Sequence, residues 1–284
     1  MRPLVVLPTY QEAADITTVL RCLRAVVPSA AILVVDDASP DGTADLADAV
    51  AREMGGIEVL RRPGKAGLGS AYRDGFRRGL ARDHDAFVEM DADLSHDPAA
   101  LPSLLAPLID GADLVVGSRY IPGGSIPDWG LHRRLLSRWG NRYAVAALGL
   151  SLTDATSGFR VYRREALAAL DLESVRAEGY GFQIEMAYRV ARNGGRIVEV
   201  PITFAERARG ASKMSGRVIA EALALVAWWA LRDRLPRGGR RPHVRGSSDA
   251  RTGRSWEAGR RTTGVTPSEA CGVPVSPARP QPGG

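Results

Sequence analysis

Short apolar runs alternate with amphipathic stretches along the first 204 residues. The apolar runs, rich in β-branched residues, predict strands at 4–8, 31–37, 57–61, 86–93, 112–120, 158–164 and 196–204. The stretches between them predict helices near 12–26, 43–54, 68–82, 98–109, 132–149, 164–171 and 181–193. Strands that are apolar on both faces and separated by helices favour an α/β fold with a mostly parallel sheet flanked by helices.

Polar side chains end or follow each of the first five predicted strands. In chain order they are Tyr10 and Glu12, Asp36 and Asp37, Lys65, Asp91 and Asp93, and Arg119. Ligands of open α/β sheets bind at the carboxyl ends of the strands. The sequence therefore predicts a binding site at this edge of the sheet.

The stretch MDADLSHDP, residues 90–98, places two carboxylates close together after the fourth predicted strand. Asp91 and Asp93 repel each other unless a positive charge lies between them. A strand end that leads into a helix, with Asp97 as the cap before Pro98, is the structural interpretation. The functional interpretation is a divalent metal ion that these oxygen ligands share with a diphosphate.

The stretch VVDDASPDGT, residues 34–43, ends the second predicted strand with Asp36 and Asp37. Its Pro-Asp-Gly turn followed by Thr43 predicts the start of a helix. The two carboxylates are then left to accept hydrogen bonds from a base or a ribose, or to play a structural part.

Lysine is rare in this chain, which has 36 Arg but only Lys65 and Lys213. Both occur in glycine-containing stretches, GKAGLG and GASKMSG, and an ammonium group is not interchangeable with a guanidinium group. Residues 201–216 also carry Arg207 and Arg209, so this loop is a candidate to close over phosphates; a solvated charged loop is the alternative. Chance placement of the two lysines is the alternative.

Two further acidic residues are candidates of second rank. Asp154 precedes a glycine-containing turn, and Glu185 follows the sequence GYGFQ near the start of a predicted helix. Each is a candidate for positioning an acceptor or binding sugar hydroxyls, although a carboxylate near a helix start also suits the helix dipole.

The net charge of +6 belongs to the C-terminal segment. Residues 235–284 hold nine Arg and three acidic residues, whereas residues 1–234 are neutral, so the folded part gives no reason to expect nucleic-acid binding. This Gly-, Pro- and Arg-rich segment is predicted to be disordered. Its arginines favour either plain solvation or attraction to anionic lipid.

The sequence predicts a protein of the cytoplasm. Cys22 and Cys271 form no disulfide framework or zinc motif, and the N-terminal apolar run is too short for a signal peptide. No apolar segment is long enough to span a bilayer. Residues 217–231 predict a short apolar helix that either packs on the domain or lies at a membrane surface through Trp228 and Trp229.

Several motifs together resemble one enzyme family. LPTYQEAADI, VVDDASPDGT, GKAGLGSAYRDGF, MDADLSHDP, GSRY, DATSGFRVYRREAL, GYGFQIEM and PITFAERARGASKM follow in that order over residues 5–214. They resemble the polyprenol (dolichol) monophosphate mannose synthases, which are family 2 glycosyltransferases with a GT-A fold. Together with the composition of the tail, the resemblance predicts one family 2 glycosyltransferase domain, 1–234, followed by the disordered tail 235–284. The apolar helix 217–234 at the end of the domain is a candidate for membrane association.

The resemblance also implies roles for individual residues. Mg²⁺ or Mn²⁺ is expected on Asp93 and Asp91, with Ser95 as a weaker ligand, and Asp91, Ala92 and Asp93 are expected to bind the nucleotide sugar. Arg119 and Arg133 correspond to arginines near the donor and acceptor phosphates. With Asp91, Asp93 and Asp154 they make up the catalytic candidates. The remaining residues expected to bind GDP-mannose are Pro8, Tyr10, Glu12, Val35, Asp37, Lys65, Arg207 and Lys213.

The sequence departs from this family at three places. Gln11 stands where Asn is common, and Ser95 where some members have a metal-binding Gln. The transmembrane helices that follow the domain in many bacterial members are not predicted here. Attachment to the cytoplasmic face of a membrane is therefore expected to be peripheral, with a separate membrane-anchor protein as a further candidate partner.

The predicted reaction transfers mannose from GDP-mannose to a polyprenyl phosphate with inversion at the anomeric carbon. One alternative is a related transferase that uses another nucleotide sugar, such as UDP-glucose, on the lipid or on a soluble acceptor. A second is a catalytically silent nucleotide-sugar-binding or membrane-adaptor protein. A nucleotidyltransferase is disfavoured because LPTYQEAADI has no glycine for a phosphate loop.

Overall fold

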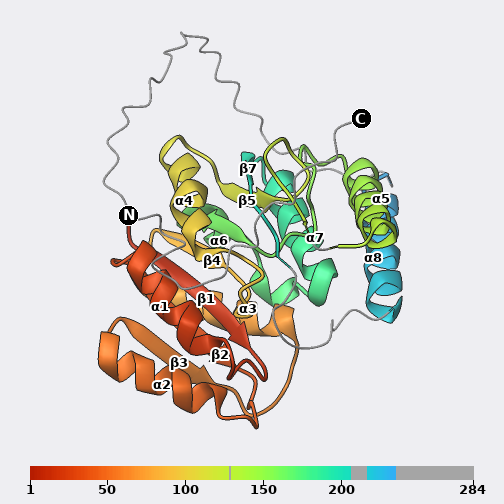
Figure 1. Cartoon of the computed structure of the whole chain (residues 1–284). Helices are drawn as coiled ribbons and strands as arrows, with labels where there is room; N and C mark the ends of the chain where they lie inside the picture. The colour runs from red at the N-terminus through yellow and green to blue at the C-terminus, as the bar shows by residue number, and fades with distance from the viewer. Residues whose placement is uncertain (128, 206–215, 235–284) are drawn as a thin grey trace, which may run out of the picture.

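The computed structural model describes residues 1–127, 129–205 and 216–234, which build a seven-stranded sheet with helices on both faces (Figure 1). The strand order is β3-β2-β1-β4-β6-β5-β7. The strands are β1 (Pro3–Thr9), β2 (Ala31–Asp36), β3 (Ile57–Arg61), β4 (Ala86–Glu89), β5 (Leu114–Ser118), β6 (Arg160–Arg163) and β7 (Ile197–Pro201). Strand β6 runs antiparallel to β4 and β5, and the other pairs are parallel. The predicted α/β fold with a mostly parallel sheet is confirmed.

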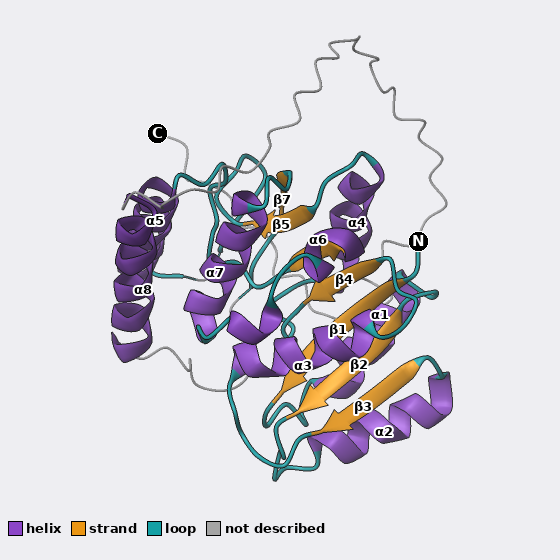
Figure 2. Ribbon diagram, turned by 180° about the vertical axis from the view of Figure 1, so that it is seen from behind, coloured by secondary structure: helices purple, strands orange, loops and turns teal. Residues whose placement is uncertain are grey.

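The helices lie where the amphipathic stretches predict them. They are α1 (Ile16–Val26), α2 (Thr43–Met54), α3 (Leu68–Leu80), α4 (Leu101–Ile109), α5 (Leu131–Leu148), α6 (Arg164–Ala168), α7 (Gly179–Arg192) and α8 (Gly216–Arg234). Two 3₁₀ turns, Pro98–Ala100 and Leu172–Ser174, complete the list for the described residues. Viewed from behind, α3 and α7 cross the sheet while α5 and α8 lie together at one end (Figure 2).

Successive side chains of β1 point to opposite faces of the sheet, and each face carries one half of the core. Val5 and Leu7 point to the face covered by α1, α2 and α4, whereas Leu4 and Val6 point to the face covered by α3 and α7. All four side chains are buried, as expected for a central parallel strand that is covered on both sides. The second half of the core continues into α5 and α8 through Ala144, Val226 and Trp229.

Two glycines let α3 approach β1 closely. A Cβ atom at Gly75 would lie 2.5 Å from Val6 Cγ1, and one at Gly79 would lie 2.4 Å from Leu4 Cδ2. Real Cβ atoms do not approach other atoms this closely, so a side chain at either position would push the helix away. The close packing holds α3, the helix that follows the GKAGLG loop, against the sheet.

The two largest differences from the predicted boundaries, four residues each, lie at the edge where the strands end. The strand predicted to reach residue 93 ends at Glu89, because the chain turns sharply there and Leu94 has a φ of +61°. The helix predicted from residue 12 begins at Ile16, after a turn in which Gln11 has a φ of +60°. Both turns carry polar residues out of the sheet and toward its carboxyl edge.

Helix α8 confirms the predicted C-terminal helix, and its two tryptophans point to different surroundings. Trp229 is buried and stacks on Tyr188 of α7, with 5.9 Å between the ring centroids, whereas the side chain of Trp228 is exposed. Among the described helices, none combines the length and apolar character that a membrane span requires. The segments 206–215 and 235–284, including Arg207, Lys213 and the predicted disordered tail, lie outside the described residues.

Candidate active site

A cleft of about 320 Å³ opens at the carboxyl edge of the sheet. It is lined by residues that follow β1, β2, β3, β4 and β5, joined by residues from α5 and α7. The predicted residues among them are Pro8, Tyr10, Glu12, Asp37, Lys65, Asp91, Ala92, Asp93, Arg119 and Arg133. The structure thus brings together side chains that lie as far apart in the sequence as residues 8 and 133.

The two carboxylates at the end of β2 differ in their surroundings. Asp36 accepts hydrogen bonds from Thr9 Oγ1 at 2.9 Å and from Ser39 Oγ at 2.6 Å, and it ties the ends of β1 and β2 together. Asp37 lines the cleft and forms an ion pair of 2.6 Å with Arg62, while Ala66 N donates to its second oxygen at 3.1 Å. Asp36 is therefore structural, and Asp37 holds the loop that contains Lys65.

Lys65 points across the cleft toward the residues that follow β1. Its Nζ atom lies 4.0 Å from the centroid of the Tyr10 ring, within the range of a cation–π contact. Its loop is also held from the other side, because Glu178 accepts hydrogen bonds from Gly69 N and Ser70 N at 2.7 and 3.1 Å. The ammonium group is thus kept at the mouth of the cleft, where a phosphate could reach it.

The carboxylates that follow β4 do not cap a helix. Asp97 does that, with Oδ1 accepting from Ala99 N at 2.8 Å. The Oδ1 atom of Asp93 accepts from Ser95 N and Ser95 Oγ at 3.1 and 2.6 Å. His96 Nδ1 accepts from Asp91 N at 3.2 Å and lies 3.9 Å from Asp91 Oδ2. The helix-cap interpretation therefore explains Asp97 and leaves Asp91 and Asp93 facing the cleft.

The donor set of this turn suits a hard divalent cation. Two carboxylates two residues apart supply oxygen ligands, which Mg²⁺ and Mn²⁺ prefer. In the part of the chain that the structure describes, no three His, Cys, Asp or Glu side chains lie close enough to enclose a metal ion. A cation on Asp91 and Asp93 would therefore need further oxygens from a ligand such as a diphosphate, or from water.

Arg119 reaches the cleft from a buried ion pair. Its Nε and Nη2 atoms each lie 2.7 Å from an oxygen of Asp154, and Nη2 also donates to Thr156 Oγ1 at 2.8 Å. Burial tends to raise the pKa of Asp154, but Arg119 outweighs it and holds that pKa below its usual value. Thr156 Oγ1 also accepts from Asn141 of α5 at 3.1 Å. The Arg119 guanidinium is thus fixed and permanently charged.

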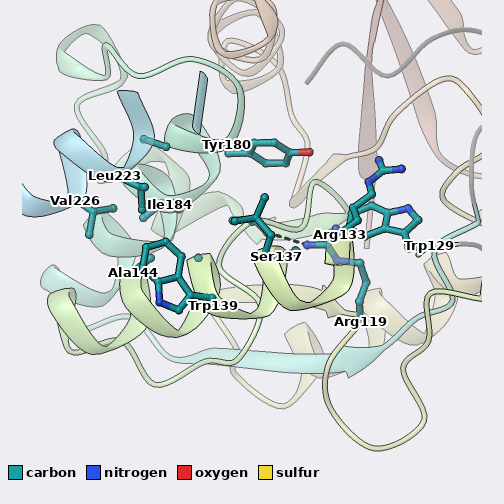
Figure 3. A pocket seen from close by; sticks show the side chains of 14 residues that line it. Arg119, Trp129, Arg133, Ser137, Trp139, Ala144, Tyr180, Ile184, Leu223 and Val226 are labelled. Carbon is teal, nitrogen blue, oxygen red and sulfur yellow. Dashed lines mark hydrogen bonds between the residues drawn. The ribbon is translucent and has the colours of Figure 1, made fainter. Parts of the chain in front are cut away.

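An apolar cavity of about 80 Å³ adjoins the polar cleft between α5, α7 and α8 (Figure 3). The two cavities share Arg119, Trp129, Arg133, Thr156 and Tyr180. Arg133 lies over the Trp129 ring, 3.9 Å from its centroid. Beyond these residues the cavity is lined by Leu136, Trp139, Ala144, Ile184, Ala222, Leu223 and Val226. A charged ligand head and an apolar tail could therefore lie in continuous space.

Besides Asp36, four predicted residues do not face the cleft. Val35 packs in the core below it, and Asp154 is fully buried behind Arg119. Ser95 is buried beside Asp93 and donates to it. Glu185 points away, accepts from Ala177 N at 3.2 Å and forms an ion pair with Arg189. The sequence gives the position of each residue in its element but not the direction in which its side chain points.

Other residues that line the cleft were missed. They include His96, Trp129, Gly158, Tyr180 and Gln183. His96 and Gln183 lie within the MDADLSHDP and GYGFQIEM stretches, so position within a motif was the available signal. Trp129 lies in no motif, and no signal in the sequence distinguishes it from an ordinary core residue.

The fold defines an α/β protein of the GT-A type, with a cleft at the carboxyl edge of the sheet. The chain belongs to glycosyl transferase family 2, whose family model matches residues 4–171.

Relatives and solved structures agree with this assignment. The chain is 52% identical to the undecaprenyl-phosphate mannosyltransferase of Micrococcus luteus, over 81% of this chain and 95% of the relative. It is 48% identical to the polyprenol monophosphomannose synthase of Mycolicibacterium smegmatis, over 83% and 89%. Its fold is similar to glucosyl-3-phosphoglycerate synthase of Mycobacterium tuberculosis, with a TM-score of 0.61, 24% identity and coverage of 81% and 80%.

Proposed function

We propose that the protein transfers mannose from GDP-mannose to a polyprenyl phosphate, such as a dolichyl phosphate, and releases GDP. The observation that carries the proposal is the junction of the two cavities at Arg119 and Arg133. A polar cleft suits a nucleotide diphosphate, and an apolar cavity suits an isoprenoid chain. The names of the two bacterial relatives support this choice of sugar and lipid.

The donor occupies the polar cleft. Tyr10, Glu12 and Asp37 contact the nucleoside, and Lys65 contacts the phosphates, consistent with its place at the mouth of the cleft. A divalent cation, Mg²⁺ or Mn²⁺, held by Asp91 and Asp93 would neutralise charge on the departing diphosphate. Arg207 and Lys213 lie outside the described residues, and closure of their loop over the phosphates stays a prediction.

The acceptor phosphate lies between Arg119 and Arg133, with its chain directed into the apolar cavity. A phosphate monoester is largely ionised near neutral pH, so the nucleophile needs no strong general base. The two arginines supply positioning and charge stabilisation, which are the main contributions that such a transfer requires. Attack from the side opposite the leaving diphosphate inverts the anomeric carbon.

The lipid substrate places the protein at a membrane surface. Helix α5 exposes Leu131, Leu135 and Trp139, which are 73%, 57% and 55% exposed and share one helix face. Helix α8 exposes Trp228 and Leu231 at the same end of the molecule (Figures 1 and 2). We expect peripheral binding on the cytoplasmic face, and a binding assay without other proteins tests whether an anchor protein is needed.

The experiment that tests the function is sugar transfer to a polyprenyl phosphate in detergent. Labelled GDP-mannose, GDP-glucose, UDP-glucose and UDP-GlcNAc are each offered with Mg²⁺, Mn²⁺ or EDTA. We expect transfer from GDP-mannose that requires a metal and is lost in Asp93→Ala. Transfer from a UDP-sugar alone would overturn the donor assignment, and unchanged transfer in EDTA would overturn the role of the metal.

A further inference from the structure

Gln183 is a buried polar residue that the mechanism above does not use. It lies near the start of α7, is 2% exposed and lines the cleft. Its amide lies beside the carboxyl group of Glu89, yet neither its nitrogen nor its oxygen makes a hydrogen bond of good geometry within the described residues. Buried amides are normally paired, so this side chain is suited to a partner that arrives with a ligand.

Gly158 marks the space that this amide faces. A Cβ atom at Gly158 would lie 3.7 Å from Gln183 Nε2, 3.7 Å from His96 Cε1 and 3.9 Å from Asp91 Oδ1. These atoms come from α7 and from the turn after β4, and they surround one small part of the cleft floor. Because Asp91 is a candidate metal and donor ligand, a donor bound there would have its reacting end next to Gln183.

The walls of this space are rigid. Arg160 is fully buried and donates to the carbonyl oxygens of Ala155, Ser157 and Gln183 at 2.6, 2.7 and 2.5 Å. One guanidinium therefore fixes the backbone of Gln183 and of the residue that precedes Gly158. A recognition residue held in this way keeps its geometry before the ligand arrives.

We infer that the space between Gly158, Asp91 and Gln183 is the subsite for the sugar ring of the donor, and that the Gln183 amide recognises its hydroxyl groups. An amide both donates and accepts hydrogen bonds, as a hydroxyl does. It is also neutral, so it adds no negative charge beside the diphosphate. This inference rests on the proposed function and adds a specificity-determining residue to it.

The test compares binding of GDP and GDP-mannose by titration calorimetry in Mg²⁺. Gln183→Met keeps the side-chain volume but removes the hydrogen-bonding groups. Gly158→Ala places a methyl group in the proposed subsite at ordinary contact distances. Tyr188→Phe is the matched control, because it also removes a polar group from α7. That hydroxyl donates a hydrogen bond of 2.5 Å to Asp233 and does not line the cleft. Thermal unfolding of each variant checks that it is folded.

We expect Gln183→Met to weaken GDP-mannose binding about 5- to 100-fold, with GDP binding changed less than twofold. Gly158→Ala should also weaken GDP-mannose binding more than GDP binding, and Tyr188→Phe should change neither affinity. Unchanged affinities in Gln183→Met, or equal losses for both ligands, would overturn the subsite. A wild-type protein that binds GDP-mannose but transfers no sugar would contradict the proposed function alone, whereas binding of neither ligand would contradict both.

Discussion

Arg119 and Arg133 reach the same cleft from different surroundings. Arg119 is 5% exposed and pairs with Asp154 through two parallel hydrogen bonds, whereas Arg133 lies over Trp129 in a partly exposed position. A buried ion pair is costly to break, because removing one charge leaves the other without compensation. One arginine is thus fixed by the fold, and the other has more freedom to follow a ligand.

This contrast predicts that neutralising Asp154, the partner of Arg119, and neutralising Arg133 have different effects. Asp154→Asn should lower the free energy of unfolding by about 3 kcal/mol and should also reduce transfer, because Arg119 loses the charge that orients it. Arg133→Met should reduce transfer with little change in stability. Denaturant unfolding and initial rates of sugar transfer measure the two effects. A fully stable Asp154→Asn protein would show that the pair is not needed for the fold.

Glu89 gives the protein a pH-dependent stability. It is fully buried at the end of β4, and burial raises its pKa from 4.5 to about 7 despite the opposing effect of Arg160. Between these values the unfolded chain has released the proton and the folded chain still holds it. Unfolding therefore becomes easier as the pH rises through this window, and above about pH 7 the contribution stays constant.

Glu89→Gln removes this titration. The stability advantage of the wild-type protein over the variant should fall by about 3 kcal/mol between pH 4.5 and pH 8, the equivalent of the pKa shift. Chemical denaturation of both proteins across this range measures it. A difference that does not change with pH would mean that Glu89 has an ordinary pKa in the folded protein.

At the scale of elements, the apolar pattern predicted each strand and helix, because an element that is buried on one or two faces has apolar residues at regular spacings in the sequence. The antiparallel direction of β6 was not predictable in this way, since a short apolar strand has the same pattern in either orientation. Strand ends were predicted less well: the β4 strand stops at Glu89, where the pattern continues through Met90. The sharp turn that follows depends on backbone conformation, which composition does not reveal.

The glycines of two helices provide a test of packing. Gly79→Ala in α3 should destabilise the protein by about 1–3 kcal/mol, because the new methyl group would lie 2.4 Å from Leu4 Cδ2 and 2.6 Å from Phe87 Cε1. Gly140→Ala in α5 has no atom within 4 Å of the added carbon and should instead stabilise the protein by up to about 1 kcal/mol. Opposite signs in denaturant unfolding would support close packing of α3; a stabilising Gly79→Ala would contradict it.

For the candidate site, the sequence predicted which strand ends contribute but not which side chains face the cleft. Asp36 and Asp37 are adjacent, yet one is sequestered by Thr9 and Ser39 and the other lines the cleft. Gln183 and Glu185 lie on the same helix, and the cleft residue is the uncharged one. Which side chain faces the cleft depends on how separate elements pack against each other, and the local sequence pattern does not determine that packing.

The whole molecule is asymmetric in a way that suits a reaction between a water-soluble donor and a lipid. The polar cleft lies at the carboxyl edge of the sheet, and the apolar cavity leads from it toward α5 and α8 (Figure 3). The exposed apolar residues of α5 and α8 lie at that end, accompanied by Arg138 and Arg142 of α5. A bilayer that contacts this end would place its isoprenoid lipids next to the cavity.

The double variant Leu131→Ser/Leu135→Ser should therefore bind anionic vesicles roughly 10-fold or more weakly than the wild-type chain, because each exposed leucine loses its transfer into lipid. GDP binding should be unchanged, since neither residue lines the polar cleft. Ile109→Ser is the control, because Ile109 is 79% exposed and belongs to α4, a helix that lies away from α5 and α8 (Figure 1). Vesicle co-sedimentation at low and high salt separates the apolar contribution from that of the arginines, because salt screens only the latter. Equal binding by wild type and the double variant, with loss only on removing residues 235–284, would assign membrane attachment to the arginine-rich tail instead of α5.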